Sequence, residues 1–375
     1  MGRLAEPQTG NGETLRARYH IGLPDPAAMN APHPPELDYP FAAPPAPGEA
    51  CTVAPGVLWI RMPLPFALDH INLWLLAERD GWTVVDCGYG DATTRALWET
   101  LFVHTLRDRP VTRIIATHFH PDHLGNARWL MERFGCPVVM TSAEFLVAHA
   151  VLEQRAPYAH ADTCALFAAH GMTPELVAAL VARGNNYRRG VPGVPDHFTN
   201  LLHGDDLVAG GSAWRIICGH GHSPDHASLH SAERKLLVSG DMLLPRISTN
   251  VSTPAAEPDG DPLARFLASI AVSATLPPET LVLPSHGLPF RGIALRVAQL
   301  QTHHADRLAE LEDAVAAAAS PVSAADMLPV LFRRELDLQQ RYFAMGEAIA
   351  HLNHLWHRDR IKRTVAADGA IRFAT

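Results

Sequence analysis

The segment Thr117–His123, THFHPDH, is the feature that most constrains this chain. It follows the apolar, β-branched run RIIA and precedes the helix-like segment LGNARWLMERFG. At the end of a strand, His118 and His120 project from the same side. Asp122 and His123 fall on the following turn, within reach of a second ion. One short segment can therefore supply ligands to two metal ions, which favours a metal-dependent fold.

Three further segments place candidate ligands directly after predicted strands. The candidates are His220, His222 and His226 after WRIICG, Asp241 after LLVSG, and His286 after TLVLPS. Functional side chains gather on loops that a rigid sheet positions. The sequence therefore predicts an open metal site at one edge of a sheet.

Composition excludes several classes of protein. The 375 residues carry 31 Lys and Arg against 39 Asp and Glu, a formal net charge of −8, which disfavours a dedicated nucleic-acid binder. Five cysteines without a CxxC pair argue against a disulfide framework or a thiolate zinc site. No apolar stretch of membrane-spanning length and no secretory leader pattern is present. We expect a cytoplasmic protein that does not associate with a membrane.

The pattern along the chain predicts three parts. Residues 1–50 are rich in proline and are expected to form an irregular arm that contributes no core. Residues 51–295 alternate strand and helix signals, as an α+β domain does. Within them, residues 142–200 are helical in pattern and are expected to cover the metals; we call them the lid segment. Residues 296–375 predict three helices and a terminal hairpin, a small winged-helix pattern.

These motifs together resemble one known family over about residues 51–295. The chain is similar to the metallo-β-lactamase superfamily through four motifs in order, with Asp86 in VVDCG upstream: HxHxDH (118–123), GHSPDH (221–226), SGD (239–241) and PSHG (284–287). The resemblance implies an α+β fold, an αββα sandwich, followed by a small winged-helix domain of the β-lactamase-like type.

The resemblance also implies a set of site residues. Seven ligands are expected: for a first metal ion His118, His120 and His222, for a second Asp122, His123 and His286, and for a bridging position Asp241. Asp86 would anchor the ligands from beneath, and His226 would orient them by hydrogen bonds. We assign catalytic roles to Asp122 and His226. Two divalent ions per chain are expected; Zn suits the set, and His and carboxylate also accept Fe or Mn.

The ligand pattern narrows the activity. The β-lactamases of the family carry a Cys in place of Asp241 or lack the bridging acid, so antibiotic hydrolysis is disfavoured. The pattern resembles the glyoxalase II, lactonase and nuclease branches, in which a metal-bridging hydroxide attacks a carbonyl or phosphoryl centre. We predict hydrolysis of a small ester, thioester or lactone. A metal-dependent endoribonuclease or phosphodiesterase is the alternative, and a mononuclear iron dioxygenase is a third.

Substrate and partner contacts are less strongly marked. His70 and, in the lid segment, Tyr187, Arg188 and Arg189 are candidate substrate-binding residues. The two arginines could grip a carboxylate, a phosphate or a coenzyme A tail, or could form a solvated basic turn. A winged helix suggests nucleic acid, but acidic residues interspersed among the arginines of the tail disfavour it. The apolar face of the helix predicted over 294–319 suggests a homodimer.

Overall fold

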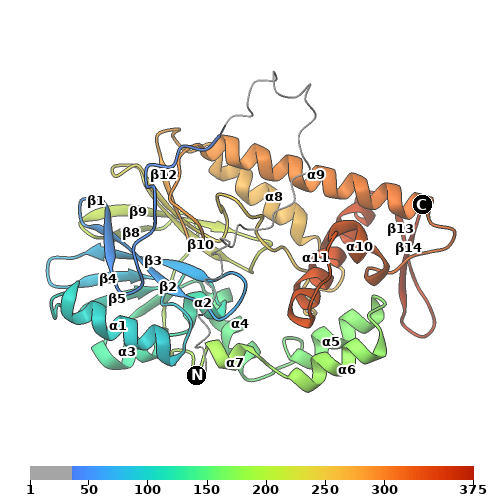
Figure 1. The fold of residues 1–375 in the computed structure, drawn as a ribbon, viewed down its shortest axis with the longest axis horizontal. Helices are drawn as coiled ribbons and strands as arrows, with labels where there is room; N and C mark the ends of the chain where they lie inside the picture. Colours follow the sequence, from blue (N-terminus) through green and yellow to red (C-terminus); the bar gives the residue numbers. More distant parts are fainter. Residues whose placement is uncertain (1–35) are drawn as a thin grey trace, which may run out of the picture. The chain divides into compact units, whose positions relative to one another are not determined.

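The computed structural model describes residues 36–375, so the predicted arm lies outside it as far as residue 35. Two sheets dominate residues 37–375 (Figure 1). In spatial order the first sheet contains β1 (Ala50–Ala54), β2 (Val57–Pro63), β3 (His70–Ala77), β4 (Trp82–Val85), β5 (Val111–Ile115), β6 (Val138–Met140) and β7 (Thr199–Asn200). The second contains β12 (Leu281–Pro284), β11 (Leu236–Gly240), β10 (His226–Ser231), β9 (Ser212–Gly219) and β8 (Asp206–Ala209).

The two sheets pack face to face because alternate residues of each strand point to opposite sides. Trp59 of β2 belongs to the core between the sheets, together with Trp214 of β9, while Ile60 belongs to the core on the other face. That outer face is covered by α1 (Ala92–His104) and α3 (Ala127–Phe134). The outer face of the second sheet is covered by α8 (Pro262–Ser273) and α9 (Ile293–Ala317). The αββα sandwich is therefore confirmed.

The direction of the strands decides where the site lies. Strands β4, β5 and β6 run parallel, and β11 runs parallel to β12. The carboxyl ends of parallel strands meet at the same edge of a sheet, so the residues that follow them come close together. Asp86 follows β4, the histidine-rich segment follows β5, Asp241 follows β11, and His286 follows β12. The short helix α2 (Pro121–Leu124) turns the chain directly after His120.

The lid segment contains four helices joined by loops and, at its end, the two-residue strand β7. Its helices are α4 (Ser142–Leu152), α5 (His160–Ala169), α6 (Pro174–Arg183) and α7 (Tyr187–Gly190). The middle helices do not stand free, because Phe167 of α5 and Leu180 of α6 share a core with C-terminal residues such as Ile349. The ends of the segment, in α4 and α7, contact the loop after β5.

The C-terminal part contains η2 (Ala325–Met327), α10 (Leu328–Leu331), α11 (Leu338–Trp356) and a hairpin of β13 (Lys362–Val365) and β14 (Ile371–Ala374). Ser323 and Asp326 form a capping box before α10, since each backbone N–H donates to the other side chain. Gly369 occupies the hairpin turn with φ 83°, a conformation that glycine adopts readily. The description of this part as a winged helix stays a prediction.

Two expectations change in this structure. Leu37 is buried in a core with residues of α8 and α9, and the Asp38 backbone pairs with Arg291, so the expectation that nothing before residue 51 enters the core is wrong. The apolar face of α9, including Val297 and Leu300, packs inside the chain, which removes the observation that suggested a homodimer. No helix among the described residues is both long and apolar enough to cross a membrane.

Candidate metal centre

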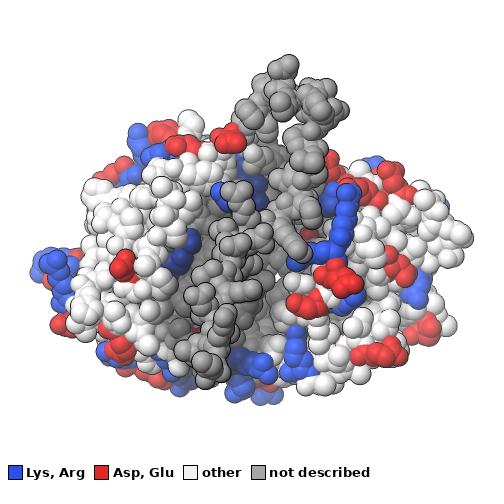
Figure 2. Space-filling model, viewed as in Figure 1, with Lys and Arg blue, Asp and Glu red and all other residues white. Residues whose placement is uncertain are grey.

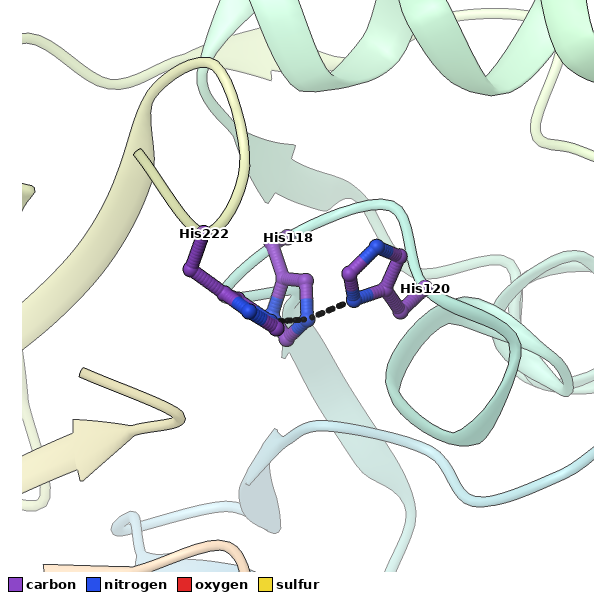
Figure 3. Close-up of side chains that lie close together, drawn as sticks. All are labelled: His118, His120 and His222. Atoms are coloured by element: carbon purple, nitrogen blue, oxygen red, sulfur yellow. Dashed lines mark hydrogen bonds between the residues drawn. The ribbon is translucent and has the colours of Figure 1, made fainter. Parts of the chain in front are cut away.

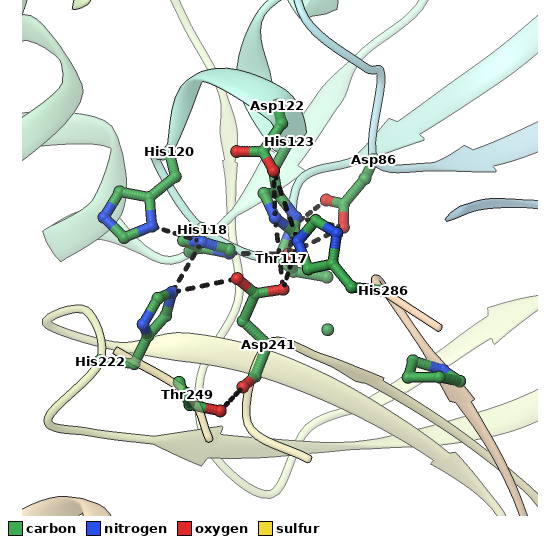
Figure 4. A network of polar contacts seen from close by, with 12 residues as sticks. Asp86, Thr117, His118, His120, Asp122, His123, His222, Asp241, Thr249 and His286 are labelled. Atoms are coloured by element: carbon green, nitrogen blue, oxygen red, sulfur yellow. Dashed lines mark hydrogen bonds and ion pairs between the residues drawn. The ribbon is translucent and has the colours of Figure 1, made fainter. Parts of the chain in front are cut away.

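The loops at the carboxyl ends of the strands bring together all seven side chains expected as metal ligands (Figure 4). They fall into three overlapping groups, in each of which the ligand atoms lie within 4.8 Å of one another. The groups are His118 with His120 and His222, His118 with His123 and Asp241, and Asp122 with His123 and His286. We call the first group the three-histidine half and the third group the Asp122 half.

The three-histidine half is built from two loops far apart in the sequence (Figure 3). The Nε2 atom of His118 lies 2.9 Å from Nδ1 of His120 and 3.2 Å from Nε2 of His222. His118 is fully buried, whereas His120 and His222 are partly exposed. Three imidazole nitrogens thus converge on one point that solvent can reach, as an open metal site requires.

The Asp122 half is more deeply buried. The Oδ2 atom of Asp122 lies 3.6 Å from Nε2 of His123 and 3.5 Å from Nε2 of His286. Both histidines are buried, and Asp122 is partly exposed. One carboxylate and two imidazoles form a donor set suited to a divalent transition metal.

Asp241 lies between the two halves. Its Oδ1 atom is 3.5 Å from Nε2 of His123 and 3.4 Å from Nε2 of His286, and its Oδ2 atom is 3.4 Å from Nε2 of His222. Each carboxylate oxygen therefore faces a different half. This is the placement that a carboxylate shared by two ions would need.

The second nitrogen of several rings is bonded away from the centre. Nδ1 of His222 donates to the Asn250 carbonyl at 2.8 Å, and Nδ1 of His286 donates to the His70 carbonyl at 2.7 Å. These bonds leave the Nε2 lone pairs free to face the centre. The buried Nε2 of His123 and Oδ1 of Asp241 have no hydrogen-bond partner within residues 36–375. Such orphaned buried atoms fit bound metal, because a cation would satisfy both.

The two halves differ in their electrostatics. Burial, reinforced by the neighbouring histidines, holds the pKa values of His118 and His120 well below the usual range, so these rings are neutral ligands. Burial also lowers the pKa of His123, but the carboxylates of Asp86, Asp122 and Asp241 outweigh it and raise this pKa to about 10. The Asp122 half thus concentrates negative charge and attracts a positive one.

Asp86 supports the centre from behind, where the resemblance placed it. It is buried just after β4 at φ 62°, a left-handed conformation that Asp tolerates better than most residues. Its carboxylate accepts the Thr117 N–H at 2.8 Å, the Thr117 hydroxyl at 2.9 Å and the Nδ1–H of His123 at 2.8 Å. Asp86 therefore fixes both the start of the histidine segment and one ring in it.

His226 contacts the backbone of Asp241 rather than the open side of the centre. Its Nε2 atom accepts the Asp241 N–H at 3.1 Å, and its ring is fully buried. A Cβ atom at Gly240 would lie 2.2 Å from this ring, so glycine is required there. His220 points into its own loop, where Nδ1 donates to the Pro224 carbonyl. Of the three histidines in this segment, His222 reaches the three-histidine half.

The candidate substrate residues have diverse positions. Nε2 of His70 accepts the Gly287 N–H at 2.9 Å and so supports the loop of His286. The buried Tyr187 donates its hydroxyl to the Phe119 carbonyl at 2.6 Å. Arg188 and Arg189 are exposed, and Arg188 donates to the Leu152 carbonyl. His70 and Tyr187 thus hold the loops that carry candidate ligands; substrate binding by any of the four stays a prediction.

Sequence reasoning missed Glu144 and Asn250. Glu144 is fully buried in the first turn of α4 and accepts three hydrogen bonds from two loops of the centre. Burial raises its pKa to about 7, and those hydrogen bonds oppose the rise. An acid in the first turn of a helix is common, because it complements the helix dipole. The sequence therefore gave no signal that this carboxylate points inward.

Comparison with known proteins places the chain and its fold in one family. Residues 67–286 match the model of the metallo-beta-lactamase superfamily, and residues 308–375 match that of the metallo-beta-lactamase-like C-terminal domain. A crystal structure of a beta-lactamase domain protein from Burkholderia ambifaria is 47% identical, covers 90% of this chain and 98% of that one, and gives a TM-score of 0.83.

Two curated relatives are more distant. The probable metallo-hydrolase YqjP of Bacillus subtilis (strain 168) is 24% identical over 80% of this chain and 92% of its own length. The atrochrysone carboxyl ACP thioesterase of Passalora fulva is 21% identical over 86% of this chain and 78% of its own length.

Proposed function

Since this chain belongs to the metallo-beta-lactamase superfamily, we propose that it is a binuclear metal-dependent hydrolase of a small ester, thioester or lactone. The observation that carries the proposal is the position of Asp241, whose two carboxylate oxygens face different halves of the centre at 3.4 to 3.5 Å. A carboxylate in this position can hold two divalent ions side by side. Zn suits the surrounding donors, and Fe or Mn can replace it.

When bound, two such ions supply a water-derived nucleophile at neutral pH and polarise the bond that is cleaved. The chain's own residues prepare the place where this happens. Asp241 holds the two halves together, and His226 fixes Asp241 through its backbone N–H. His120, Asp122 and His222 are partly exposed, so a substrate approaches over them, while the other histidines form the buried floor. Of the two residues assigned catalytic roles from the sequence, Asp122 would act at the open side of the centre, and His226 would act as a positioning residue.

A small acyl substrate is favoured by two observations. One curated relative is a thioesterase, and its similarity extends over most of this chain. The alternative, nuclease activity, requires a cationic surface for the phosphate backbone. Lys and Arg lie interspersed with Asp and Glu on the face shown in Figure 2. The tail arginines Arg333, Arg358, Arg360 and Arg363 each form an ion pair with an acid.

A substrate panel with metal analysis tests the proposal. The purified protein would be assayed for bound metal and for turnover of p-nitrophenyl esters, acyl thioesters, lactones, bis-p-nitrophenyl phosphate and a β-lactam. We expect two ions per chain and turnover of carbonyl substrates. Asp241→Ala should lower that turnover by about a thousandfold, because metal catalysis contributes several kcal/mol. Asp313→Ala, at an exposed position of α9, is the matched control.

Other results would redirect or overturn the proposal. Turnover of the phosphodiester alone would replace it with nuclease activity. A single iron per chain without hydrolysis would favour an oxygenase. If Asp241→Ala still bound two ions and kept full activity, the proposed role of Asp241 as a shared carboxylate would be wrong.

A further inference from the structure

Glu144 lies outside the ligand set but joins two of its loops. Its Oε2 atom accepts the Phe119 N–H at 2.9 Å, and its Oε1 atom accepts the Ser223 hydroxyl and the Asp225 N–H, each at 2.7 Å. The side chain is fully buried, so its acceptor groups meet protein donors rather than bulk water. Glu144 is thus a carboxylate clamp between the loop after β5 and the loop after β9.

These two loops carry every member of the three-histidine half. Phe119 stands between His118 and His120, and its N–H belongs to the peptide that joins it to His118. Ser223 directly follows His222, so its bond to Glu144 fixes the other loop beside its ligand. The Phe119 carbonyl is also held, by the Tyr187 hydroxyl at 2.6 Å. The lid segment therefore fixes both peptide groups of Phe119, one from α4 and one from α7.

The Asp122 half is supported by other residues. His123 is held by Asp86, and His286 is held by the His70 carbonyl. Within residues 36–375, the hydrogen bonds of the Glu144 side chain go to Phe119, Ser223 and Asp225. A change at Glu144 should therefore disturb one half of the centre more than the other.

We propose that Glu144 is a positioning residue that sets the affinity of the three-histidine half for a divalent ion without touching the ion. The inference rests on the proposed function, in which these histidines bind metal. The carboxylate is required because all three partners are donors, and an ionised carboxylate only accepts. A glutamine has nearly the same shape but turns one acceptor into a donor, which would face the N–H of Phe119 or the donors of the other loop.

The test measures metal affinity in backgrounds that retain one half each. His286→Ala disables the Asp122 half, and His120→Ala disables the three-histidine half. Metal-free full-length proteins are titrated with Zn²⁺ by calorimetry and with Co²⁺ by absorption spectroscopy. In the His286→Ala background, Glu144→Gln should weaken binding about 10- to 100-fold, the usual effect of losing a residue that orients ligands. In the His120→Ala background it should change the affinity less than about twofold.

Two further variants keep the result interpretable. Glu233→Gln makes the same chemical change at an exposed position in the turn between β10 and β11 and should leave both affinities unchanged. Ser223→Ala removes one of the three donors to Glu144. It should weaken metal binding by the three-histidine half by a smaller factor than Glu144→Gln does, and it tests the clamp even if Glu144→Gln does not fold. Thermal unfolding of each metal-free variant establishes that it is folded.

The failure of each claim gives a different result. Equal weakening by Glu144→Gln in both backgrounds, or no weakening in either, would overturn the positioning role while leaving the metal centre intact. A wild-type chain that binds neither ion would overturn the proposed function itself.

Discussion

The two halves of the metal centre are supported by different parts of the molecule. The Asp122 half rests on the sandwich: Asp86 after β4 holds His123, and Asn72 of β3 donates to the carbonyls of Pro284 and Gly287 on either side of His286. Asp86 also holds Thr117 beside His118, but the other supports of the three-histidine half come from segments added to the sandwich. This half is held by Glu144 of α4 and by Asn250, which lies in the loop after β11.

The C-terminal part reaches the three-histidine half through the Asn250 loop. The Asn250 amide donates to Glu347 of α11 at 3.4 Å, and the Thr253 N–H donates to the Gly346 carbonyl at 3.1 Å. If each half binds an ion as proposed, the difference teaches that a buried core fixes one site, while the lid segment and α11 can tune the other. The tunable half is also the more exposed of the two. In the proposed function, it is the side from which substrate approaches.

Metal removal should have the largest effect. Dialysis against a chelator should lower hydrolysis by about a thousandfold, and added Zn²⁺ should restore it. Metal should also stabilise the fold, by about 2.7 kcal/mol per site at a hundredfold excess over Kd. His120→Ala and His286→Ala should each abolish the stabilisation that comes from one site. The measurement is the shift in melting temperature on adding Zn²⁺, which should be smaller in each variant than in the wild-type chain. A full shift retained in either variant would contradict the division into two halves.

Asp86→Ala should destabilise the metal-free protein more than any change in the three-histidine half. It leaves the buried donors of Thr117 and His123 without an acceptor. Breaking a buried pair in this way lowers the free energy of unfolding by about 3–5 kcal/mol. Urea unfolding of the metal-free chain measures it, with Glu144→Gln beside it for comparison. If Glu144→Gln destabilised the chain by as much, the sandwich would not be the firmer support.

Gly346→Ala tests the link from α11 to the three-histidine half. A Cβ atom there would lie 2.5 Å from Oγ and 2.7 Å from Cβ of Ser252, so the Asn250 loop must shift. We expect an overpacking cost of about 1–3 kcal/mol and weaker Zn²⁺ binding by the His286→Ala background. Adding Ser252→Gly should relieve the clash and restore binding. An unchanged affinity in the single variant would show that α11 does not influence this half.

Tyr187→Phe should have the smallest effect. It removes the hydroxyl that donates to the Phe119 carbonyl. Such a hydrogen bond contributes about 0.5–1.5 kcal/mol to stability. Calorimetry should show that the three-histidine half binds Zn²⁺ a few-fold more weakly, while the Zn²⁺ affinity of the Asp122 half is unchanged. Tyr158→Phe, at a half-exposed position of the lid segment, is the control. A loss of turnover without a loss of metal affinity would instead support the predicted role of Tyr187 in binding substrate.

The sequence pattern predicted that candidate ligands gather at one edge of a sheet, because each follows a predicted strand; the αββα sandwich and the choice of seven ligands came from the family resemblance. Local spacing marks such residues: His118 and His120 stand together, and Asp241 ends a strand. Glu144 could not be predicted, because its partners Phe119 and Ser223 are brought to it only by the packing of α4 on the sheet. The burial of Leu37 could not be predicted for the same reason. The surrounding prolines predict an irregular arm, and only the surface formed by α8 and α9 buries this side chain.

Anomalous X-ray diffraction from crystals of the Zn²⁺-loaded protein tests the binuclear centre most directly. Two peaks, one on each side of the Asp241 carboxylate and about 3.5–4 Å apart as in other two-metal sites, are the expected result. A single peak in fully loaded crystals, or two peaks that Asp241 does not join, would contradict it.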